Sequence, residues 1–350
     1  MKQFNCGIIG CGAVAQNVYV PIFQLLETAT LKAVCDRNQE RAEKLVKQKN
    51  INIYNDLTTL LTAENLDVVI ILTPPEFHCV MACQAMDAGC DVLIEKPFTY
   101  SLAEADQVIA KQQETGRRFS VIHNELFKPT VTELKTRVMS GEIGKICSVR
   151  FFSGRRNQTF IPEPWYFQTY GGRVGETLPH ALYQLIEYFD DLVVEYVRAR
   201  KLGHCIIPDV AKSVDVKYDE LFVEFSSPTS NAIASLSYSF NSNQDLSLVV
   251  AGTEGTLLAY LSGKIVKWSA TPPSLKQLFT TLPEWQFAIK QKLAKFFPKN
   301  QGQKIRNSPH YRQISQFFKQ IETQEPFTVT SEKAREVVRL WEEIVSIYAK

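Results

Sequence analysis

Short apolar blocks alternate with stretches of helical spacing over residues 1–122. Strands are predicted over 6–9, 31–35, 68–72, 92–94 and 119–122, and helices over 13–26, 39–47, 77–88 and 101–115. The block at 68–72 is apolar throughout, which is typical of a strand buried on both faces of a sheet. Strands that alternate with helices pair in parallel through right-handed crossovers. This half of the chain therefore predicts an α/β fold with a doubly wound parallel sheet.

The pattern changes to a period of two after residue 123. Ser235 and Ser237 alternate with Leu236 and Tyr238, as in a strand with one buried and one polar face. Strands are predicted over 146–152, 193–200, 214–225, 232–240, 246–251 and 256–261, and helices over 178–188, 311–321 and 331–348. We therefore predict two domains, 1–123 and 124–350, the second an α+β domain with a mostly antiparallel sheet.

A glycine-containing turn joins the first predicted strand to the first predicted helix. It reads Gly10-Cys11-Gly12-Ala13-Val14-Ala15, the pattern G-x-G-x-x-A. The first glycine permits a tight turn, the second lets a pyrophosphate approach the backbone, and the small alanine allows close packing of helix on strand. The N–H groups at the positive helix end favour phosphates. We therefore expect a dinucleotide to bind at Gly10, Gly12, Ala13, Val14 and Ala15.

Asp36 ends the second predicted strand. A carboxylate at that place accepts hydrogen bonds from ribose hydroxyls and repels a 2′-phosphate, which favours NAD over NADP. The neighbouring Arg37 could instead meet a 2′-phosphate, so NADP remains the less favoured alternative. Asp36 could also be a loop carboxylate that caps the following helix.

Two further motifs follow predicted strands at their carboxyl ends, Thr73-Pro74-Pro75-Glu76-Phe77-His78 and Glu95-Lys96-Pro97. Ligands of open α/β sheets bind at that edge. We therefore expect Thr73, Pro74, His78, Glu95 and Lys96 to lie beside the cofactor. As an alternative, Glu95 and Lys96 could form a surface ion pair. For His78, a structural or cofactor-adjacent place is favoured over a catalytic one.

In these motifs the sequence resembles the Gfo/Idh/MocA family, which includes glucose–fructose oxidoreductase and inositol dehydrogenases. The resemblance extends over nearly the whole chain, through Asn124-x-x-Phe127-x-Pro129, Gly141-x-Ile143-Gly144, Trp165, the segment from Gly171-Gly172 to His180, and Gly252-Thr253-Glu254-Gly255. It implies a Rossmann domain that holds a nicotinamide cofactor, an open-faced sheet domain for substrate binding and oligomerisation, and an active site between them. A homodimer or homotetramer is expected from the same analogy.

The resemblance also implies roles for single residues. The lysine that matches Lys96 contacts the reacting hydroxyl, and the histidine that matches His180 is the usual general base. Glu176 stands where the family has an aspartate, so the carboxylate is kept. Tyr183 stands where the family usually has a second aspartate, three residues after the histidine.

The side chains themselves suit the removal of a hydroxyl proton. Imidazole titrates near neutral pH, so His180 can accept that proton, and the Lys96 ammonium would stabilise a developing alkoxide. Glu176 could orient the imidazole or bind a neighbouring hydroxyl. Because Pro179 indicates that a helix begins near residue 178, Glu176 is expected in the preceding turn. Alternatively, His180 is a buried histidine bonded to backbone, and Glu176 is a carboxylate at a helix start.

Cations and aromatic residues gather in the segment before His180. Aromatic faces pack on sugar rings and arginines bind phosphate, which favours a carbohydrate or nucleotide-sugar substrate. The predicted contacts in this segment are Trp165 and Arg173, and ordinary core and surface roles remain open for both. Asn124, from the motif that carries the resemblance, is the third predicted contact.

Composition excludes some classes of protein. The 350 residues carry 39 basic and 37 acidic side chains, a net charge of +2, which does not indicate a nucleic-acid partner. No apolar run approaches the ~18–20 residues of a membrane span. The eight cysteines contain no C-x-x-C pair and predict buried free thiols in a reducing cytoplasm, with no bound metal. A zinc site near Cys79 and Cys83 is the alternative.

One segment departs from this neutral balance. Residues 276–306 hold seven basic residues and one acidic residue, and an apolar helix face is predicted within them. Such a helix could lie on an anionic membrane surface. The alternative is a helix that covers a domain and exposes its charged face to solvent.

The motifs and the resemblance together favour an oxidoreductase that transfers hydride between NAD(H) and a hydroxyl or keto carbon of a sugar, nucleotide sugar or cyclitol. A glycosidase of the same fold that uses NAD, and a non-catalytic NAD-binding regulator, are the alternatives. The presence of both Lys96 and His180 argues against the regulator, because a sensor needs no proton acceptor.

Overall fold

The first sheet is a six-stranded parallel sheet. The computed structural model describes residues 2–46, 51–154, 165–204, 215–243, 246–261, 263–268 and 300–349. The strands are β1 (Phe4–Ile9), β2 (Ala29–Cys35), β3 (Asn52–Tyr54), β4 (Val68–Ile71), β5 (Asp91–Ile94) and β6 (Phe119–Val121), in the order β3-β2-β1-β4-β5-β6. All pairs are parallel. The predicted doubly wound sheet is therefore confirmed.

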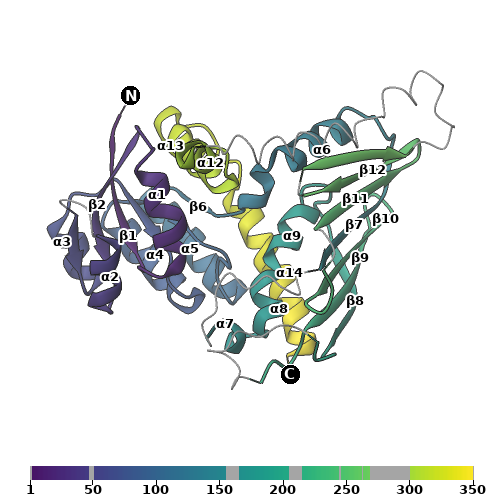
Figure 1. Ribbon diagram of the computed structural model, residues 1–350, viewed down its shortest axis with the longest axis horizontal. Helices are drawn as coiled ribbons and strands as arrows, with labels where there is room; N and C mark the ends of the chain where they lie inside the picture. The colour runs from purple at the N-terminus through teal and green to yellow at the C-terminus, as the bar shows by residue number, and fades with distance from the viewer. Residues whose placement is uncertain are drawn as a thin grey trace.

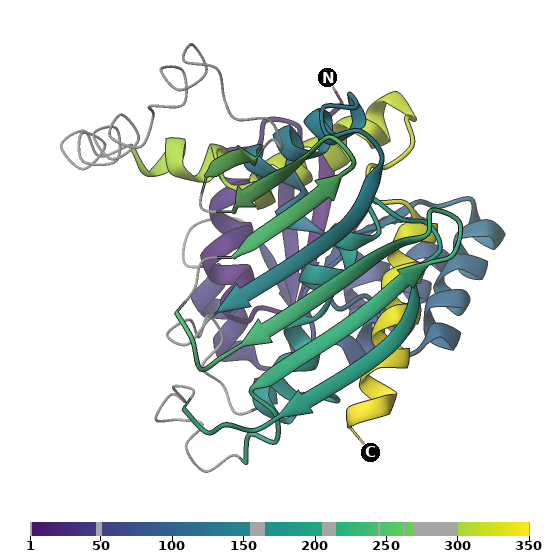
Figure 2. The ribbon, with the colours of Figure 1, turned by 90° about the vertical axis from the view of Figure 1, so that its right-hand side faces the viewer.

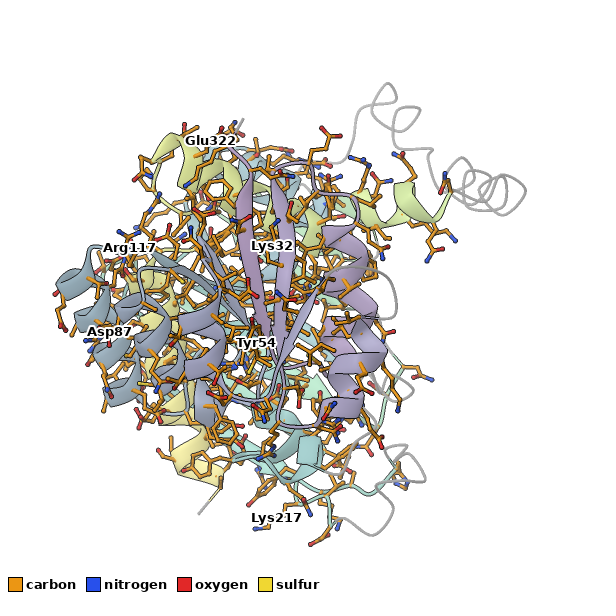
Figure 3. The ribbon with its side chains drawn as sticks, turned by 90° about the vertical axis from the view of Figure 1, so that its left-hand side faces the viewer. Lys32, Tyr54, Asp87, Arg117, Lys217 and Glu322 are labelled. Atoms are coloured by element: carbon orange, nitrogen blue, oxygen red, sulfur yellow. The ribbon has the colours of Figure 1, made fainter. Side chains whose placement is uncertain are left out.

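Helices cover both faces of this sheet (Figure 1). They are η1 (Ala15–Tyr19), α1 (Val20–Phe23), α2 (Gln39–Leu45), α3 (Leu57–Ala63), η2 (Pro75–Phe77), α4 (His78–Asp87) and α5 (Leu102–Thr115). Helix α5 begins at a capping box, in which Ser101 and Glu104 each accept the other's backbone N–H, and it ends at the left-handed Gly116. Figure 3 looks onto this half, with Lys32 of β2 and Tyr54 of β3 labelled.

The second sheet has seven strands and is antiparallel apart from one pair. Its strands are β7 (Ile146–Gly154), β8 (Val193–Arg200), β9 (Glu220–Ser227), β10 (Ala232–Ser239), β11 (Ser247–Gly252), β12 (Gly255–Tyr260) and β13 (Lys264–Trp268), in the order β13-β12-β11-β7-β10-β9-β8. Strands β7 and β10 are parallel. The mostly antiparallel sheet is confirmed.

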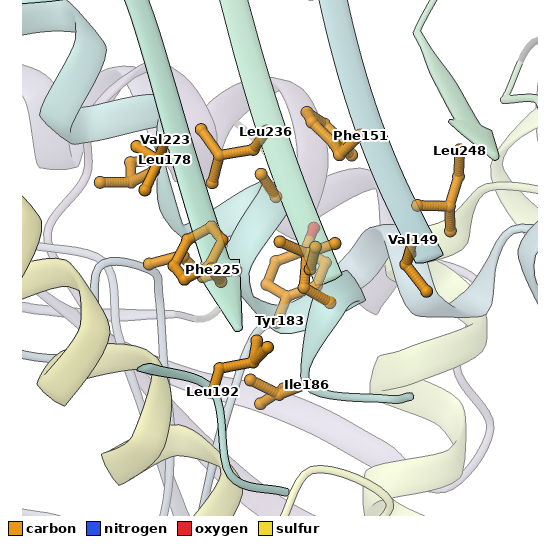
Figure 4. Packing of buried hydrophobic residues seen from close by; sticks show 14 of the residues in the cluster. Val149, Phe151, Leu178, Tyr183, Ile186, Leu192, Val223, Phe225, Leu236 and Leu248 are labelled. Carbon is orange, nitrogen blue, oxygen red and sulfur yellow. The ribbon is translucent and has the colours of Figure 1, made fainter. Parts of the chain in front are cut away.

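Alternation along these strands divides the sheet into an inner and an outer face. Leu236 is fully buried whereas Ile233 is 48% exposed. The inner side chains pack on the helical segment that carries Leu178 and Tyr183 (Figure 4). The outer face is turned toward the viewer in Figure 2, and no described helix covers it there. Only the inner face therefore contributes to the core.

The remaining described helices come after β6 in the chain. They are η3 (Asn124–Phe127), α6 (Pro129–Met139), α7 (Trp165–Gln168), α8 (Gly172–Thr177), α9 (Pro179–Leu185), α12 (Gln301–Arg306), α13 (Pro309–Thr323) and α14 (Ser331–Tyr348). Helix α14 runs between the halves in Figure 1, with Val338 in the core of the first and Trp341 in the core of the second. Helix α13 packs Phe318 against Phe4 of β1. The predicted domain boundary at residue 123 stays a prediction. The packing of α13 shows that the C-terminal part of the chain returns to the first sheet.

Several predicted bounds differ from the structure. The helix predicted over 13–26 contains a π-helical segment, η1, and the strand predicted from 214 begins at Glu220. Strand β3 and helix α3 were not predicted, because β3 is short and its Ile53 is 39% exposed. The predicted helix of the basic segment 276–306, between Pro283 and Pro298, lies outside the described residues. None of the described helices is both long and apolar enough to cross a bilayer.

Candidate active site

The glycine turn after β1 has the backbone that a pyrophosphate cradle needs. Gly10 has φ +94°, and a Cβ there would stand 2.8 Å from the backbone of Leu72, so only glycine fits. A Cβ on Gly12 would instead meet no atom within 4 Å. The Gly12 carbonyl accepts the N–H of Gln16, so helical bonding starts at this turn. The open space over Gly12 and the first N–H groups of the helix fit a dinucleotide phosphate.

Asp36 is bonded to the same turn. One carboxylate oxygen accepts the Cys11 N–H at 2.7 Å, and the other accepts the Asn38 N–H at 2.8 Å. The cap of α2 is Asn38, which accepts the N–H of Arg41. The alternative of Asp36 as the helix cap is therefore wrong. Arg37 is exposed beside it.

His78 connects the two loops that follow β4 and β5. The ring is fully buried, with Nδ1 2.9 Å from the Pro97 carbonyl oxygen and 3.0 Å from that of Phe98. Its Nε2 lies 2.8 Å from the carbonyl oxygen of Thr73. Burial lowers the pKa of His78, and these carbonyl oxygens together with Glu95 oppose that effect. The contacts support the structural role for His78, which fixes the loop that carries Lys96.

Glu95 and Lys96 point to different partners. Glu95 is 9% exposed and accepts the hydroxyl hydrogen of Tyr19 at 2.8 Å and the Lys96 N–H at 3.0 Å. Lys96 Nζ donates to Glu176 Oε1 at 2.9 Å and to the Glu176 carbonyl oxygen at 3.3 Å. The alternative of a surface ion pair between Glu95 and Lys96 is therefore wrong.

The Lys96–Glu176 ion pair joins the two halves of the molecule. Its side chains are 16% and 4% exposed, and Lys96 follows β5 whereas Glu176 lies in α8. Burial opposes the charge on Lys96, but the electrostatic influence of Glu176, Tyr166 and Glu95 outweighs it and raises the lysine pKa. Burial raises the pKa of Glu176, and the adjacent ammonium only partly offsets this. The site thus holds a cation at the carboxyl edge of the parallel sheet.

The expected position of Glu176 in a turn is wrong. Helix α8 ends at Thr177 and helix α9 begins at Pro179, so the proline starts a second helix directly after the first. Glu176 therefore lies in the last turn of α8. The Glu176 carboxylate, which was expected either to orient the His180 imidazole or to bind a neighbouring hydroxyl, is bonded to Lys96 instead.

His180 lies in the first turn of α9, half-buried. Its Nδ1 is 2.7 Å from the hydroxyl oxygen of Tyr183 on the same helix. That hydroxyl oxygen accepts the Glu125 N–H at 3.3 Å and lies 3.5 Å from Asn124 Oδ1. Asn124 is therefore in the surroundings of His180, and its contact with substrate stays a prediction.

Two residues of this region were not predicted, Tyr19 and His310. His310 Nδ1 is 3.5 Å from Asn124 Nδ2, and its ring centroid is 6.5 Å from that of Tyr19. Burial lowers the pKa of His310 despite the nearby carboxylates. No pattern in the sequence links His310 with Asn124, because 186 positions separate them.

The other two predicted substrate contacts are Arg173 and Trp165. Arg173 is 1% exposed, and its guanidinium carbon is 4.0 Å from the ring centroid of Phe240. This packing favours the core role that was left open for Arg173, and its contact with substrate stays a prediction. The backbone of Trp165 opens α7, and its side chain lies outside the described part of the chain.

The cysteines are free thiols wherever the chain is described. The structure describes seven cysteines, of which six are buried and Cys147 is exposed. The prediction that all of them are buried is therefore wrong for Cys147. Cys205 lies outside the described residues. Burial is the main cause that raises the pKa of Cys79 and of Cys83. Within the described ranges, no group of three or more His, Cys, Asp or Glu side chains could hold a metal ion.

This fold and this site define a two-domain, dinucleotide-binding oxidoreductase. The chain belongs to the Gfo/Idh/MocA family: residues 4–123 match the model described as "Oxidoreductase family, NAD-binding Rossmann fold", and residues 131–258 match the family's C-terminal domain. It is therefore an enzyme of this oxidoreductase family, and NAD is its cofactor.

Named relatives include dehydrogenases. The chain is 27% identical over 259 residues to the scyllo-inositol 2-dehydrogenase (NAD(+)) of Bacillus subtilis, with 73% of each chain covered. It is 29% identical over 146 residues to the D-glucoside 3-dehydrogenase of Escherichia coli, covering 41% of this chain and 42% of the relative. The fold matches the WlbA dehydrogenase of Bordetella pertussis with a TM-score of 0.75 at 16% identity, covering 98% and 95% of the two chains.

Proposed function

We propose that this protein is an NAD-dependent dehydrogenase or reductase that acts on a hydroxyl or keto carbon of a sugar, cyclitol or nucleotide sugar. The observation that carries the proposal is the Lys96–Glu176 ion pair, 2.9 Å long, between the NAD-binding domain and the second domain. A buried cation at the carboxyl edge of a dinucleotide-binding sheet is suited to hold an oxygen on which negative charge develops.

The chain's own residues divide the work as follows. NAD supplies the hydride acceptor when bound. The Lys96 ammonium holds the substrate oxygen, and Glu176 keeps that ammonium protonated and fixed in direction. His180 exchanges the hydroxyl proton through Nε2, since its Nδ1 faces Tyr183. The roles of Lys96, Glu176 and His180 are parts of this proposal.

The substrate class is inferred from the relatives. A cyclitol dehydrogenase and a glucoside dehydrogenase are among them, and the structural neighbour from Bordetella pertussis was crystallised with NADH and UDP-GlcNAcA. Each of these substrates carries a secondary carbinol on a six-membered ring. Trp165 and Arg173 stay predicted contacts for such a ring or its phosphates, beside Asn124.

The test is oxidation of a panel of sugars, cyclitols and UDP-sugars by the purified protein with NAD. We expect the absorbance of reduced cofactor to rise with at least one member of the panel. A chromogenic glycoside that is cleaved without accumulation of NADH would favour the glycosidase instead. Tight NAD binding without turnover of any compound would favour the non-catalytic NAD-binding regulator and contradict the proposal.

Asp36→Ala is expected to raise KM for NAD by ~10-fold or more, because charge-assisted hydrogen bonds of the carboxylate are lost. The ratio of activity with NADP to activity with NAD should rise, since the charge that repels a 2′-phosphate is gone. Steady-state kinetics with both cofactors measures both effects. Asp56→Ala is the matched control, because Asp56 also accepts a backbone N–H, from Thr59 in α3. Unchanged KM and cofactor ratio in the Asp36 variant would contradict the assignment.

The expected homodimer or homotetramer stays a prediction. The outer face of the second sheet exposes Val193, Tyr196, Phe222 and Ile233, each at least 40% accessible. Apolar side chains gathered on one uncovered sheet face support contact with a second copy. A cytoplasmic location also stays a prediction.

A further inference from the structure

The hydroxyl of Tyr183, which faces His180, can either donate a hydrogen to the imidazole ring or accept one from it. The inference drawn from this contact rests on the proposed role of His180 as acid and base. Tyr183 is fully buried in the core beneath the second sheet (Figure 4). Its ring stacks on His123, with ring centroids 4.5 Å apart and planes tilted by 20°. The hydroxyl is therefore held at a fixed place, 2.7 Å from His180 Nδ1.

The hydroxyl has a single hydrogen, and His180 Nδ1 and Asn124 Oδ1 are two acceptors within its reach. One oxygen lone pair already receives the Glu125 N–H at 3.3 Å. The hydrogen can point to His180 Nδ1, which then places the proton of the neutral ring on Nε2. It can instead point to Asn124 Oδ1 at 3.5 Å, and then the hydroxyl oxygen can accept from a protonated Nδ1.

The surroundings of Asn124 favour the arrangement in which the Tyr183 hydroxyl donates to Asn124 and accepts from His180. Burial lowers the pKa of His310, which favours the neutral ring, and the tautomer with its proton on Nε2 leaves Nδ1 to accept a hydrogen. Asn124 Nδ2 lies 3.5 Å from that nitrogen, which directs the amide oxygen toward Tyr183. Each donor in the series then faces an acceptor, from His180 Nδ1 through Tyr183 and Asn124 to His310.

We propose that the His310–Asn124–Tyr183 chain is a positioning device that keeps the proton of neutral His180 on Nδ1. Nε2 then carries the lone pair that a base needs. In the oxidation the substrate O–H bond breaks, its proton joins Nε2, and the resulting imidazolium still donates from Nδ1 to the Tyr183 oxygen. The reverse transfer returns the same proton, so Tyr183 neither gains nor loses one.

A phenol and a carboxylate differ in what they do for the imidazolium. A carboxylate in place of Tyr183 would add an attractive negative charge, which raises the pKa of a neighbouring histidine by ~1–3 units. The uncharged Tyr183 therefore lets His180 stay neutral at a lower pH. Charged and titratable side chains on the elements packed around the pair are Glu125 of η3, Lys128 directly after it, His123, Lys333 of α14, His310 of α13, and the Lys96–Glu176 pair.

The decisive measurement is NMR of the full-length, NAD-bound protein labelled with ¹⁵N in the histidine rings. His180→Asn identifies the two His180 resonances by their loss. We expect the neutral wild-type ring to carry its proton on Nδ1, and Tyr183→Phe to move a large part of the population to the Nε2 tautomer. Tyr218→Phe, which removes a hydroxyl bonded to the Tyr348 carbonyl oxygen, is the matched control and should leave the His180 signals unchanged.

A second arm uses Tyr183→Asp. The His180 titration midpoint should rise by at least one pH unit, and the acid limb of kcat should shift equally with whichever sugar the panel identifies. A wild-type ring with its proton on Nε2, or a tautomer unchanged in Tyr183→Phe, overturns the inference. Because the spectra need no substrate, they decide the role of Tyr183 even if no compound is oxidised and the proposed function fails.

Discussion

Replacing Lys96 by methionine is expected to lower kcat by ~10²–10³-fold, the usual loss when a donor to a developing oxyanion is removed. The ammonium is largely buried and paired with Glu176 at 2.9 Å, so its charge acts where solvent screening is weak. Methionine retains most of the side chain's length and apolar volume, so the packing around position 96 is changed little. Stopped-flow and steady-state rates with the substrate found in the panel measure the loss.

A matched control separates this effect from the loss of any lysine ion pair in the same domain. Lys111→Met removes a lysine that pairs with Asp87 and Glu114 in the same domain, away from the proposed site. It should leave kcat within about twofold, because exposed pairs contribute little. If Lys96→Met still bound NAD and turned over as fast as the Lys111 variant, the proposed role of Lys96 would be wrong.

Glu176 makes a related pH dependence testable. Burial disfavours the charge on Lys96, and Glu176, Tyr166 and Glu95 together raise its pKa above the ordinary value. Removing one carboxylate in Glu176→Gln lowers the lysine pKa, so the ammonium is lost at a lower pH. The alkaline limb of kcat should therefore move to lower pH in that variant. A limb that stays in place means that a group other than Lys96 controls it.

The parallel sheet could be predicted because its signals are local. Strand β4 is a continuous apolar run, and the capping box at Ser101 and the glycine at 116 mark both ends of α5. Gly10 and Asp36 could be predicted for the same reason, since a tight turn and a strand end are defined by neighbouring residues. Such features depend on a few adjacent side chains and not on distant ones.

The details of the site depend on contacts between distant segments. Proline at 179 indicates a helix start equally well after a turn and after another helix, so the helical position of Glu176 could not be read from it. The Lys96–Glu176 pair spans 80 positions, and the approach of His310 to Asn124 depends on the packing of α13. No periodicity encodes such pairs, because they arise from the way the two domains and α13 meet.

Replacing His180 by asparagine is expected to lower kcat by ~10²–10⁴-fold, the usual contribution of a general acid–base group. Asparagine keeps a polar side chain that can still bond to the Tyr183 hydroxyl, so the helix α9 and its core packing should be retained. KM for NAD should change by less than about threefold, because the cofactor turn lies in the other domain. The acid limb of the pH–rate profile should vanish, since asparagine has no proton to gain between pH 5 and 8.

His204→Asn is the matched control, because His204 is exposed and its backbone N–H is bonded to Asn241. This variant should keep both kcat and the acid limb. A weak external base such as imidazole should partly restore the rate of His180→Asn if the missing function is proton transfer, and should not change that of Lys96→Met. If His180→Asn retained the rate and pH profile of the wild type, proton transfer would have to pass through another group, and His310 would be the next candidate because it lies beside Asn124.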